Sequence, residues 1–283
     1  MSHAILLISC PDQRGITAAV AQFVADHNGN IIDAQQHSDT GTDAFFMRIE
    51  WSLDGFDLNR EEIHPAFGLI SHKFNMETSL SFDDDVKRLA IFVSKPLHCL
   101  YDLLYRHRSG QLSCEIPLII SNHEEARKLA DDFGIRFSHW AVFRENKVDV
   151  ERQQMELLKE HRIDSIVLAR YHQILTPYFI NEYRGRIINI HHSFLPAFVG
   201  ANPYQQAHQK GVKIIGVTSH FVTQELDQGP IIEQDTVRIS HRDSIEDLKR
   251  KGEDLERVVL SRAVRWHLQQ KILCIQNRTV VFD

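Results

Sequence analysis

Features that mark several common protein classes are missing from this sequence. Its apolar runs fall well short of the roughly 20 residues that a helix needs to cross a bilayer. It has no excess of basic residues, because 32 Lys and Arg stand against 38 Asp and Glu, a formal net charge of −6. A nucleic-acid-binding protein needs a basic face to meet phosphate. We therefore expect neither a membrane nor a nucleic acid as a partner.

Cysteine is scarce, with four residues in 283 and no CxxC pair. Such usage is typical of buried free thiols in a reducing cytosol. The N-terminus has a short apolar run, "AILLIS", and no basic leader, which predicts a first strand and not a signal peptide. The sequence thus predicts a cytoplasmic protein whose cysteines are buried and not catalytic. They are Cys10, Cys99, Cys114 and Cys274.

Phosphate-binding and metal-binding signatures are missing as well. No GxGxxG or GxxxxGK[ST] follows an expected strand, and there is no GxSxG elbow for a serine nucleophile. The 17 histidines include no HExxH. His191 and His192 are adjacent, so on a strand they point apart and cannot share one ion. We predict no metal site and no cofactor.

The patterns that are present predict two domains. Residues 1–83 read as β-α-β-β-α-β, a ferredoxin-like order, with the elements at 4–9, 16–27, 31–39, 44–51, 63–74 and 76–82. The acidic run at 83–85 has no apolar anchor, so we place a linker at 84–87 and the second domain at 88–283.

In the second domain, apolar strands alternate with amphipathic helices. This predicts an α/β fold, Rossmann-like, with a mainly parallel sheet and helices on both faces. Strands are expected at 89–94, 115–121, 164–169, 186–191, 213–222 and 230–239, and helices at 97–107, 123–134, 148–161 and 244–268. A short hairpin at 271–282 closes the chain. Sites in such sheets form beyond the carboxyl ends of the strands, where His191 lies.

Two short stretches carry groups suited to catalysis. In "IINIHHSFLP", Asn189 and His191 are two apart, so on a strand both face one side and could stabilise an oxyanion together. In "ELDQGP", Asp227 could orient a histidine or activate a water. On spacing alone, a buried pair bonded to the backbone and an ordinary solvated turn remain the alternatives.

Together the two stretches resemble a known family. "INIHHSFLP", followed about 30 residues later by "HFVTQELDQGPII", is similar to the formyltransferase fold family, whose members use 10-formyltetrahydrofolate. The resemblance runs from residue 88 to the C-terminus and implies that Asn189, His191 and Asp227 are catalytic. It also implies folate contacts from Leu168, Ala169, Arg170, Tyr171, Val222, Glu225 and Leu226.

The first domain resembles a second family. "CPDQRGITAAVAQFVADHNGNI" is similar to the ACT domain, a regulatory module that often binds amino acids between copies. This implies a homo-oligomer, a dimer or tetramer, with a candidate effector site at Asp12, Gly15, Asn30 and Ile31. An ACT domain ahead of a formyltransferase-fold domain resembles the formyltetrahydrofolate deformylases. That resemblance implies hydrolysis of 10-formyltetrahydrofolate in one-carbon metabolism and purine biosynthesis.

Departures from the family patterns refine this interpretation. Where transformylases carry a glycine-rich phosphate loop, this chain reads "VSKPLHCLYDLL", which serves a phosphorylated acceptor poorly and favours water as the acceptor. His172 and Gln173 replace the usual Met and Arg near the pterin, and Asn202 stands where the deformylases would have Arg. The alternatives are a formyltransferase acting on an amine and a non-catalytic sensor of folate or amino acids.

Overall fold

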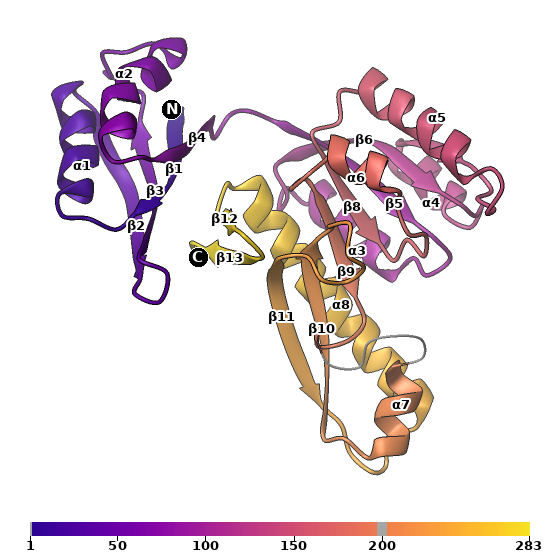
Figure 1. The fold of residues 1–283 in the computed structure, drawn as a ribbon. Helices are drawn as coiled ribbons and strands as arrows, with labels where there is room; N and C mark the ends of the chain where they lie inside the picture. The colour runs from indigo at the N-terminus through magenta and orange to yellow at the C-terminus, as the bar shows by residue number, and fades with distance from the viewer. Residues whose placement is uncertain (1, 197–202) are drawn as a thin grey trace. The chain divides into compact units, whose positions relative to one another are not determined.

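The computed structural model describes residues 2–196 and 203–283, and the chain divides into two compact units (Figure 1). The first unit comprises the chain up to Val86 together with Gln269–Leu273 and Val280–Asp283. The second comprises Lys87–Leu268 and Cys274–Thr279. The expected second domain at 88–283 therefore differs from the structure at its C-terminal end. Part of that end belongs to the first unit, where the Gln270 carbonyl accepts a hydrogen bond from Arg48 Nε at 3.2 Å.

The first unit is a four-stranded antiparallel sheet with two helices. Its elements are β1 (His3–Pro11), α1 (Ile16–Asp26), β2 (Asn30–Asp39), β3 (Ala44–Ser52), α2 (Arg60–Lys73) and β4 (Glu77–Phe82), and the strand order is β2-β3-β1-β4. Alternate residues of β1, from Ala4 to Cys10, point into one core with the apolar sides of α1 and α2. The ferredoxin-like order expected from the sequence is confirmed.

The second unit is built on a seven-stranded sheet of order β11-β10-β9-β8-β5-β6-β7. Its strands are β5 (Lys87–Val93), β6 (Cys114–Ser121), β7 (Arg136–His139), β8 (Ser165–Ala169), β9 (Ile187–His191), β10 (Ile214–Phe221) and β11 (Ile231–Arg238). The neighbouring strands β9, β8, β5, β6 and β7 pair in parallel, in this order across the sheet. β10 is antiparallel to both of its neighbours, β9 and β11. The expectation of a mainly parallel sheet is confirmed.

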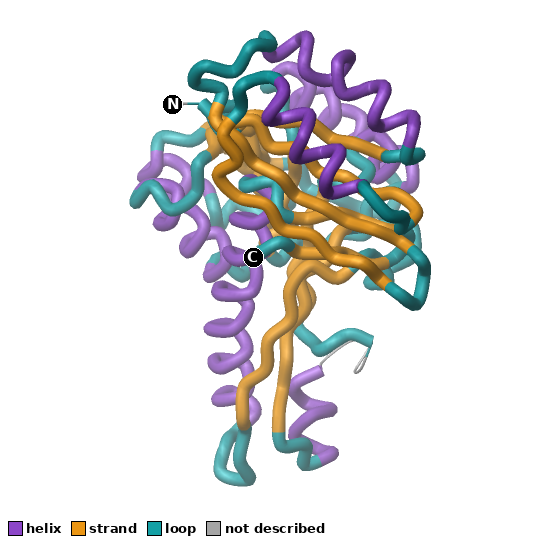
Figure 2. The backbone as a smooth tube through the Cα atoms, turned by 90° about the vertical axis from the view of Figure 1, so that its left-hand side faces the viewer, coloured by secondary structure: helices purple, strands orange, loops and turns teal. Residues whose placement is uncertain are grey.

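Helices flank this sheet. They are α3 (His98–Arg108), α4 (Arg127–Phe133), α5 (Lys147–Glu160), α6 (Pro177–Glu182), α7 (Pro203–Lys210) and α8 (Ile245–Leu268). Figure 2 shows the long α8 running beside β10 and β11, against which it packs. Ser244 and Asp247 form a capping box at its start, with Asp247 N–H 3.1 Å from Ser244 Oγ. The sequence did not predict β7, α6 and α7, of which β7 and α6 are too short to show a period, and α4 begins four residues later than expected.

The cysteines differ from expectation at one position. Cys10, Cys99 and Cys114 are buried, but Cys274 is exposed. Cys274 lies in β12 (Ile272–Ile275), whose partner among the described strands is β13 alone (Arg278–Val281). In such a hairpin alternate side chains face out, and here Leu273 takes the buried position. Within the described part of the chain, no helix is both long and apolar enough to cross a membrane.

His267 near the end of α8 provides a test of acid stability. Burial lowers the pKa of its imidazole to about 4, and its Nε2 lies 2.8 Å from Ser165 Oγ. Between pH 6.5 and 4 the unfolded chain binds a proton there that the folded chain does not, so the free energy of unfolding falls as pH falls. We expect His267→Gln to remove on the order of 2–3 kcal/mol of this fall. Urea unfolding of the parent and of His267→Gln at pH 7 and pH 4.5 measures this difference. If the free energy of unfolding fell equally in both, His267 would not be the source of the acid sensitivity.

Candidate active site

A pocket of about 340 Å³ lies where β8 and β9 end and where the loop between β10 and β11 crosses them. This size is at the lower end of the range for small-molecule sites. It is lined by Leu168, Arg170, Tyr171, His172, Gln173, Ile174, Leu175, Ile180, Asn189, Ile190, His191, His192, His220, Val222, Thr223, Gln224, Glu225, Leu226 and Asp227. The position agrees with the rule that open α/β sheets bind ligands beyond the carboxyl ends of their strands.

The structure brings Asn189, His191 and Asp227 together in this pocket. Asp227 Oδ1 lies 3.4 Å from His191 Nδ1, so the carboxylate faces one nitrogen of the ring. The hydrogen bond from His191 is the main cause that lowers the pKa of Asp227, and it outweighs burial, which acts in the opposite direction. His191 Nε2 is buried and has no hydrogen-bond partner among the residues that the structure describes. A buried polar atom without a partner is costly, so this atom is available to a bound ligand.

His220 on β10 is a site residue that the sequence analysis missed. Its side chain is 2% exposed, and its Nδ1 lies 2.9 Å from the Phe221 carbonyl, which can only accept. Nδ1 therefore carries the proton. Since burial lowers the pKa of His220, its Nε2 is unprotonated at neutral pH and accepts from Asn189 Nδ2 at 3.2 Å. This bond orients the Asn189 amide. Only the antiparallel register, in which His220 lies opposite Asn189, reveals the pairing.

Replacing His220 by Phe keeps a ring of similar volume but removes the acceptor. We expect kcat to fall about tenfold with little change in KM, because Asn189 loses its fixed orientation but keeps its donor. Complete loss of such a donor typically costs about 10²–10³. Steady-state kinetics of the variant measure this. Unchanged kcat, with the fold intact by circular dichroism, would show that Asn189 does not depend on His220.

Six of the seven expected folate-contacting residues line the pocket, and Ala169 does not. Ala169 is the last residue of β8 and is fully buried. In a strand, neighbours point to opposite faces, so Ala169 faces away from the side of Leu168, which lines the pocket. His172 and Gln173, which depart from the family pattern, also line the pocket. Asn202 lies outside the described residues.

The loop that carries Asp227 depends on a close approach of two backbone segments. A Cβ at Gly229 would lie 1.8 Å from the Phe221 carbonyl oxygen, so no larger residue fits. Phe221 is held in turn by its own N–H, which donates to the Pro230 carbonyl at 2.9 Å. The glycine of the "LDQGP" motif is thus a steric requirement that places Asp227 over the end of β9.

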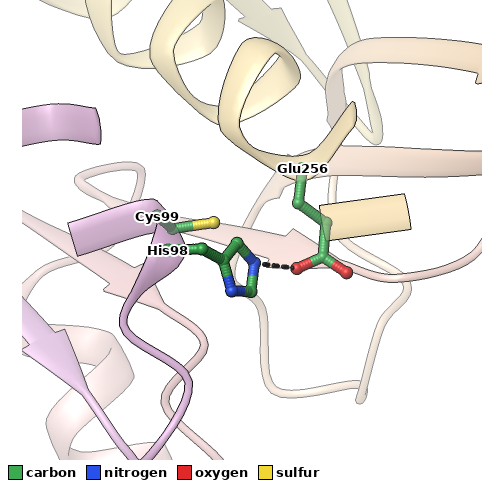
Figure 3. A group of neighbouring side chains, drawn as sticks. All are labelled: His98, Cys99 and Glu256. Carbon is green, nitrogen blue, oxygen red and sulfur yellow. Dashed lines mark hydrogen bonds and ion pairs between the residues drawn. The ribbon is translucent and has the colours of Figure 1, made fainter. Parts of the chain in front are cut away.

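His98 lies at the start of α3, where the sequence lacks a glycine-rich loop. Figure 3 shows its ring meeting Glu256 of α8, with Nε2 2.7 Å from Oε2. Together with Cys99 these residues form a group whose potential metal-ligating atoms lie within 4.8 Å of one another. Burial raises the pKa of the Cys99 thiol well above its ordinary value, which favours the protonated form over the thiolate that binds metal. Arg170 Nε also lies 3.4 Å from Glu256 Oε2, so a cation already faces this carboxylate.

The expected effector residues do not meet within one chain. Asp12 and Gly15 follow β1, whereas Asn30 and Ile31 begin β2. In the sheet, Asn30 lies opposite Ser52, which lies opposite His3 at the other end of β1. Nine strand residues at about 3.3 Å each separate the two ends by roughly 25–30 Å. A shared effector site would therefore need two copies of the chain.

Comparison with known proteins agrees with this architecture. Residues 87–264 match the model of the formyl transferase family, and residues 4–63 match that of the ACT domain. The chain is 56% identical to a formyltetrahydrofolate deformylase of Synechocystis sp. over 99% of this chain and 98% of that one. A Bacillus subtilis protein of the same name is 50% identical, over 98% and 93% respectively.

A solved structure is similar along the whole chain. The crystal structure of a formyltetrahydrofolate deformylase from Pseudomonas syringae pv. tomato superimposes with a TM-score of 0.97 at 46% identity. The match covers 100% of this chain and 95% of that one. With an N-terminal ACT domain, a formyl transferase domain and this similarity over the full length, the chain belongs to the formyltetrahydrofolate deformylase family.

Proposed function

We propose that this chain hydrolyses 10-formyltetrahydrofolate to formate and tetrahydrofolate, with water as the acceptor. One observation carries the proposal. His191 faces Asp227 through Nδ1 and keeps a buried Nε2 without a partner among the described residues, beside the Asn189 amide. This is the arrangement that an acyl oxygen needs when it gains negative charge. The names of the similar proteins supply the substrate.

The chemistry follows from these groups. Water attacks the formyl carbon as Asp227 accepts its proton, and the carbonyl electrons move onto oxygen. Asn189 Nδ2 and His191 Nε2–H donate to that oxyanion, and the Asp227 carboxylate holds the imidazole through Nδ1 until it takes the water's proton. The intermediate collapses as its C–N bond breaks. The departing nitrogen takes the proton that Asp227 had accepted, which restores the carboxylate, and the formic acid formed gives its own proton to solvent, leaving formate and tetrahydrofolate. The reaction consumes water alone, so the proposal requires no metal and no cofactor.

The direct test is formate release in the absence of any amine. Purified chain is incubated with 10-formyltetrahydrofolate, and formate and tetrahydrofolate are measured together. Equal amounts of the two products, with turnover, are expected. Turnover only after an amine is added would identify a formyltransferase, and folate binding without turnover a sensor.

We also propose that the ACT domain regulates this activity through an amino acid bound between two copies of the chain. The separation of Asp12 and Gly15 from Asn30 and Ile31 supports a site that needs both copies. A regulatory module suits a reaction that would otherwise waste activated formyl groups. Light scattering with and without each amino acid, alongside formate release, tests both the oligomer and the effector.

A further inference from the structure

Arg170 occupies an unusual backbone conformation at the wall of the pocket. It follows β8 directly and has a φ of +64°, in the left-handed region that a residue with a long side chain rarely adopts. Its carbonyl accepts from Ser94 N–H at 3.2 Å, which holds this conformation. Such strain persists where the surroundings impose it, and it concentrates at functional sites.

Arg170 and His191 stand at the carboxyl ends of two neighbouring parallel strands, β8 and β9. Leu168 of β8 lies opposite Asn189 of β9 in a parallel pair. Arg170 is two residues beyond Leu168, and His191 is two residues beyond Asn189. Both Arg170 and His191 line the pocket. Arg170 thus flanks the centre where formyl oxygen and water react.

A buried carboxylate holds the Arg170 side chain. Glu256 is 1% exposed; its Oε2 lies 3.4 Å from Arg170 Nε and 2.7 Å from His98 Nε2. Its Oε1 accepts from the Tyr204 hydroxyl at 3.1 Å. Burial acts to raise the pKa of Glu256, but the His98 hydrogen bond and the Arg170 charge lower it, so the carboxylate is ionised at neutral pH. Removing one partner from a buried set of charges is strongly destabilising, whereas an apolar core would need none of them.

A glycine in the middle of α8 makes room for this cluster. A Cβ at Gly252 would lie 1.9 Å from the Tyr204 hydroxyl oxygen. Glycine weakens a helix interior by roughly 0.5–1 kcal/mol relative to alanine. Gly252 thus leaves room for the Tyr204 hydroxyl that bonds to Glu256, and Glu256 in turn forms the ion pair with Arg170.

The outer nitrogens of the Arg170 guanidinium have no acceptor within the described part of the chain. Nε lies 3.4 Å from Glu256 Oε2 as an ion pair and makes no hydrogen bond with the described residues, while Nη1 and Nη2 belong to a side chain that is 14% exposed and lines the pocket. Two parallel N–H groups match a carboxylate, which they bind in a bidentate manner. Neighbouring His192 adds no charge at neutral pH, because burial, then Arg170 and His191, lower its pKa to about 4.

We propose that Arg170 forms a subsite for formate, the small carboxylate that the hydrolysis releases, and that Glu256 is its positioning residue. The inference rests on the proposed hydrolysis and gives Arg170 a ligand other than the folate that the family resemblance implied. The carboxylate forms beside His191 and moves onto Nη1 and Nη2 as the C–N bond breaks. No co-reactant is needed, since formate already carries the charge that the guanidinium binds.

Binding of ¹³C-formate to the full chain, followed by NMR in the absence of folate, tests the subsite without turnover. We expect Arg170→Gln to weaken formate binding about 10- to 100-fold, as for the loss of a charged hydrogen-bonding partner. Arg170→Lys keeps the positive charge but loses the pair of parallel N–H donors. Its formate affinity should therefore lie between those of the parent and Arg170→Gln. Glu256→Gln should weaken binding less than Arg170→Gln, and Tyr204→Phe serves as a milder second variant if Glu256→Gln fails to fold. Arg184→Gln, which removes an exposed arginine, is the matched control and should bind formate like the parent.

Each outcome has a defined meaning. Equal formate affinity in the parent and Arg170→Gln, or equal loss in Arg184→Gln, overturns the subsite. So does a stoichiometric metal ion that Glu256→Gln loses, since the His98, Cys99 and Glu256 group would then be a metal site. If the chain hydrolyses 10-formyltetrahydrofolate but binds formate independently of Arg170, the subsite is wrong and the proposed function stands. If formate binding depends on Arg170 but the chain does not hydrolyse 10-formyltetrahydrofolate, the proposed function is wrong and the subsite stands.

Discussion

Asp227→Asn is expected to lower kcat for formate release by about 10³-fold while KM stays within a few-fold. The substitution keeps the size of the side chain but removes its charge, which lies 3.4 Å from His191 Nδ1. The proposed water then loses its proton acceptor and the imidazolium loses its partner. General acid–base catalysis alone contributes about 10²–10⁴. Steady-state formate release from 10-formyltetrahydrofolate measures the change.

Asp235→Asn is the matched control, because it removes the same charge from β11, where Asp235 pairs with Arg262 at the surface. Its kcat should equal that of the parent. The low pKa of Asp227 adds a second check. Asp227 stays ionised until the pH falls below its ordinary value of 3.8, so its protonation should not limit the rate above that pH. If Asp227→Asn lowered kcat less than tenfold, the Asp227 carboxylate would not be the proton acceptor in the reaction.

Gly229→Ala is expected to lower kcat about 10²-fold and to destabilise the second unit by about 1–3 kcal/mol. The added Cβ would lie 1.8 Å from the Phe221 carbonyl oxygen, and this neighbour is backbone, so it cannot rotate away. Phe221 and Val222 are tied to Pro230 and Ile187 by backbone hydrogen bonds of 2.9 Å. The loop must therefore shift and carry Asp227 with it. Overpacking typically costs 1–3 kcal/mol, and a displacement of about 1 Å can cost 10²-fold in rate.

Gly68→Ala is the control for adding a methyl group to glycine. Gly68 lies inside α2, and a Cβ there meets nothing within 4 Å. Alanine at such a position should stabilise the chain by about 0.5–1 kcal/mol and leave kcat unchanged. Thermal unfolding followed by circular dichroism, with formate release on the same samples, compares the two variants. If Gly229→Ala also retained the parent's rate and melting temperature, the close approach at this loop would not matter.

Elements with a strong period could be predicted from the sequence, and weak ones could not. Buried strands such as β1 and β8 and the long α8 follow directly from apolar runs and from 3.6-residue spacing. β7 has four residues and α6 has six, less than two helical turns, so no period can be measured. The pattern of the C-terminal hairpin could not show how its residues divide between the two units. Alternating apolar residues indicate which side of a strand is buried but not which element packs against that side.

The sequence by itself determined which residues face the same way within a strand and which motifs stand in the chain. It therefore placed Asn189 beside His191 and singled out Asp227. Tertiary structure alone decided what these groups meet. The antiparallel register of β10 on β9 brings His220 to Asn189, and the neighbouring ends of β8 and β9 bring Arg170 and His191 into one pocket. Glu256 reaches Arg170 from 86 positions further along the chain. Local spacing reports only on a residue's own element, whereas strand order and helix packing arise from the burial of the whole chain.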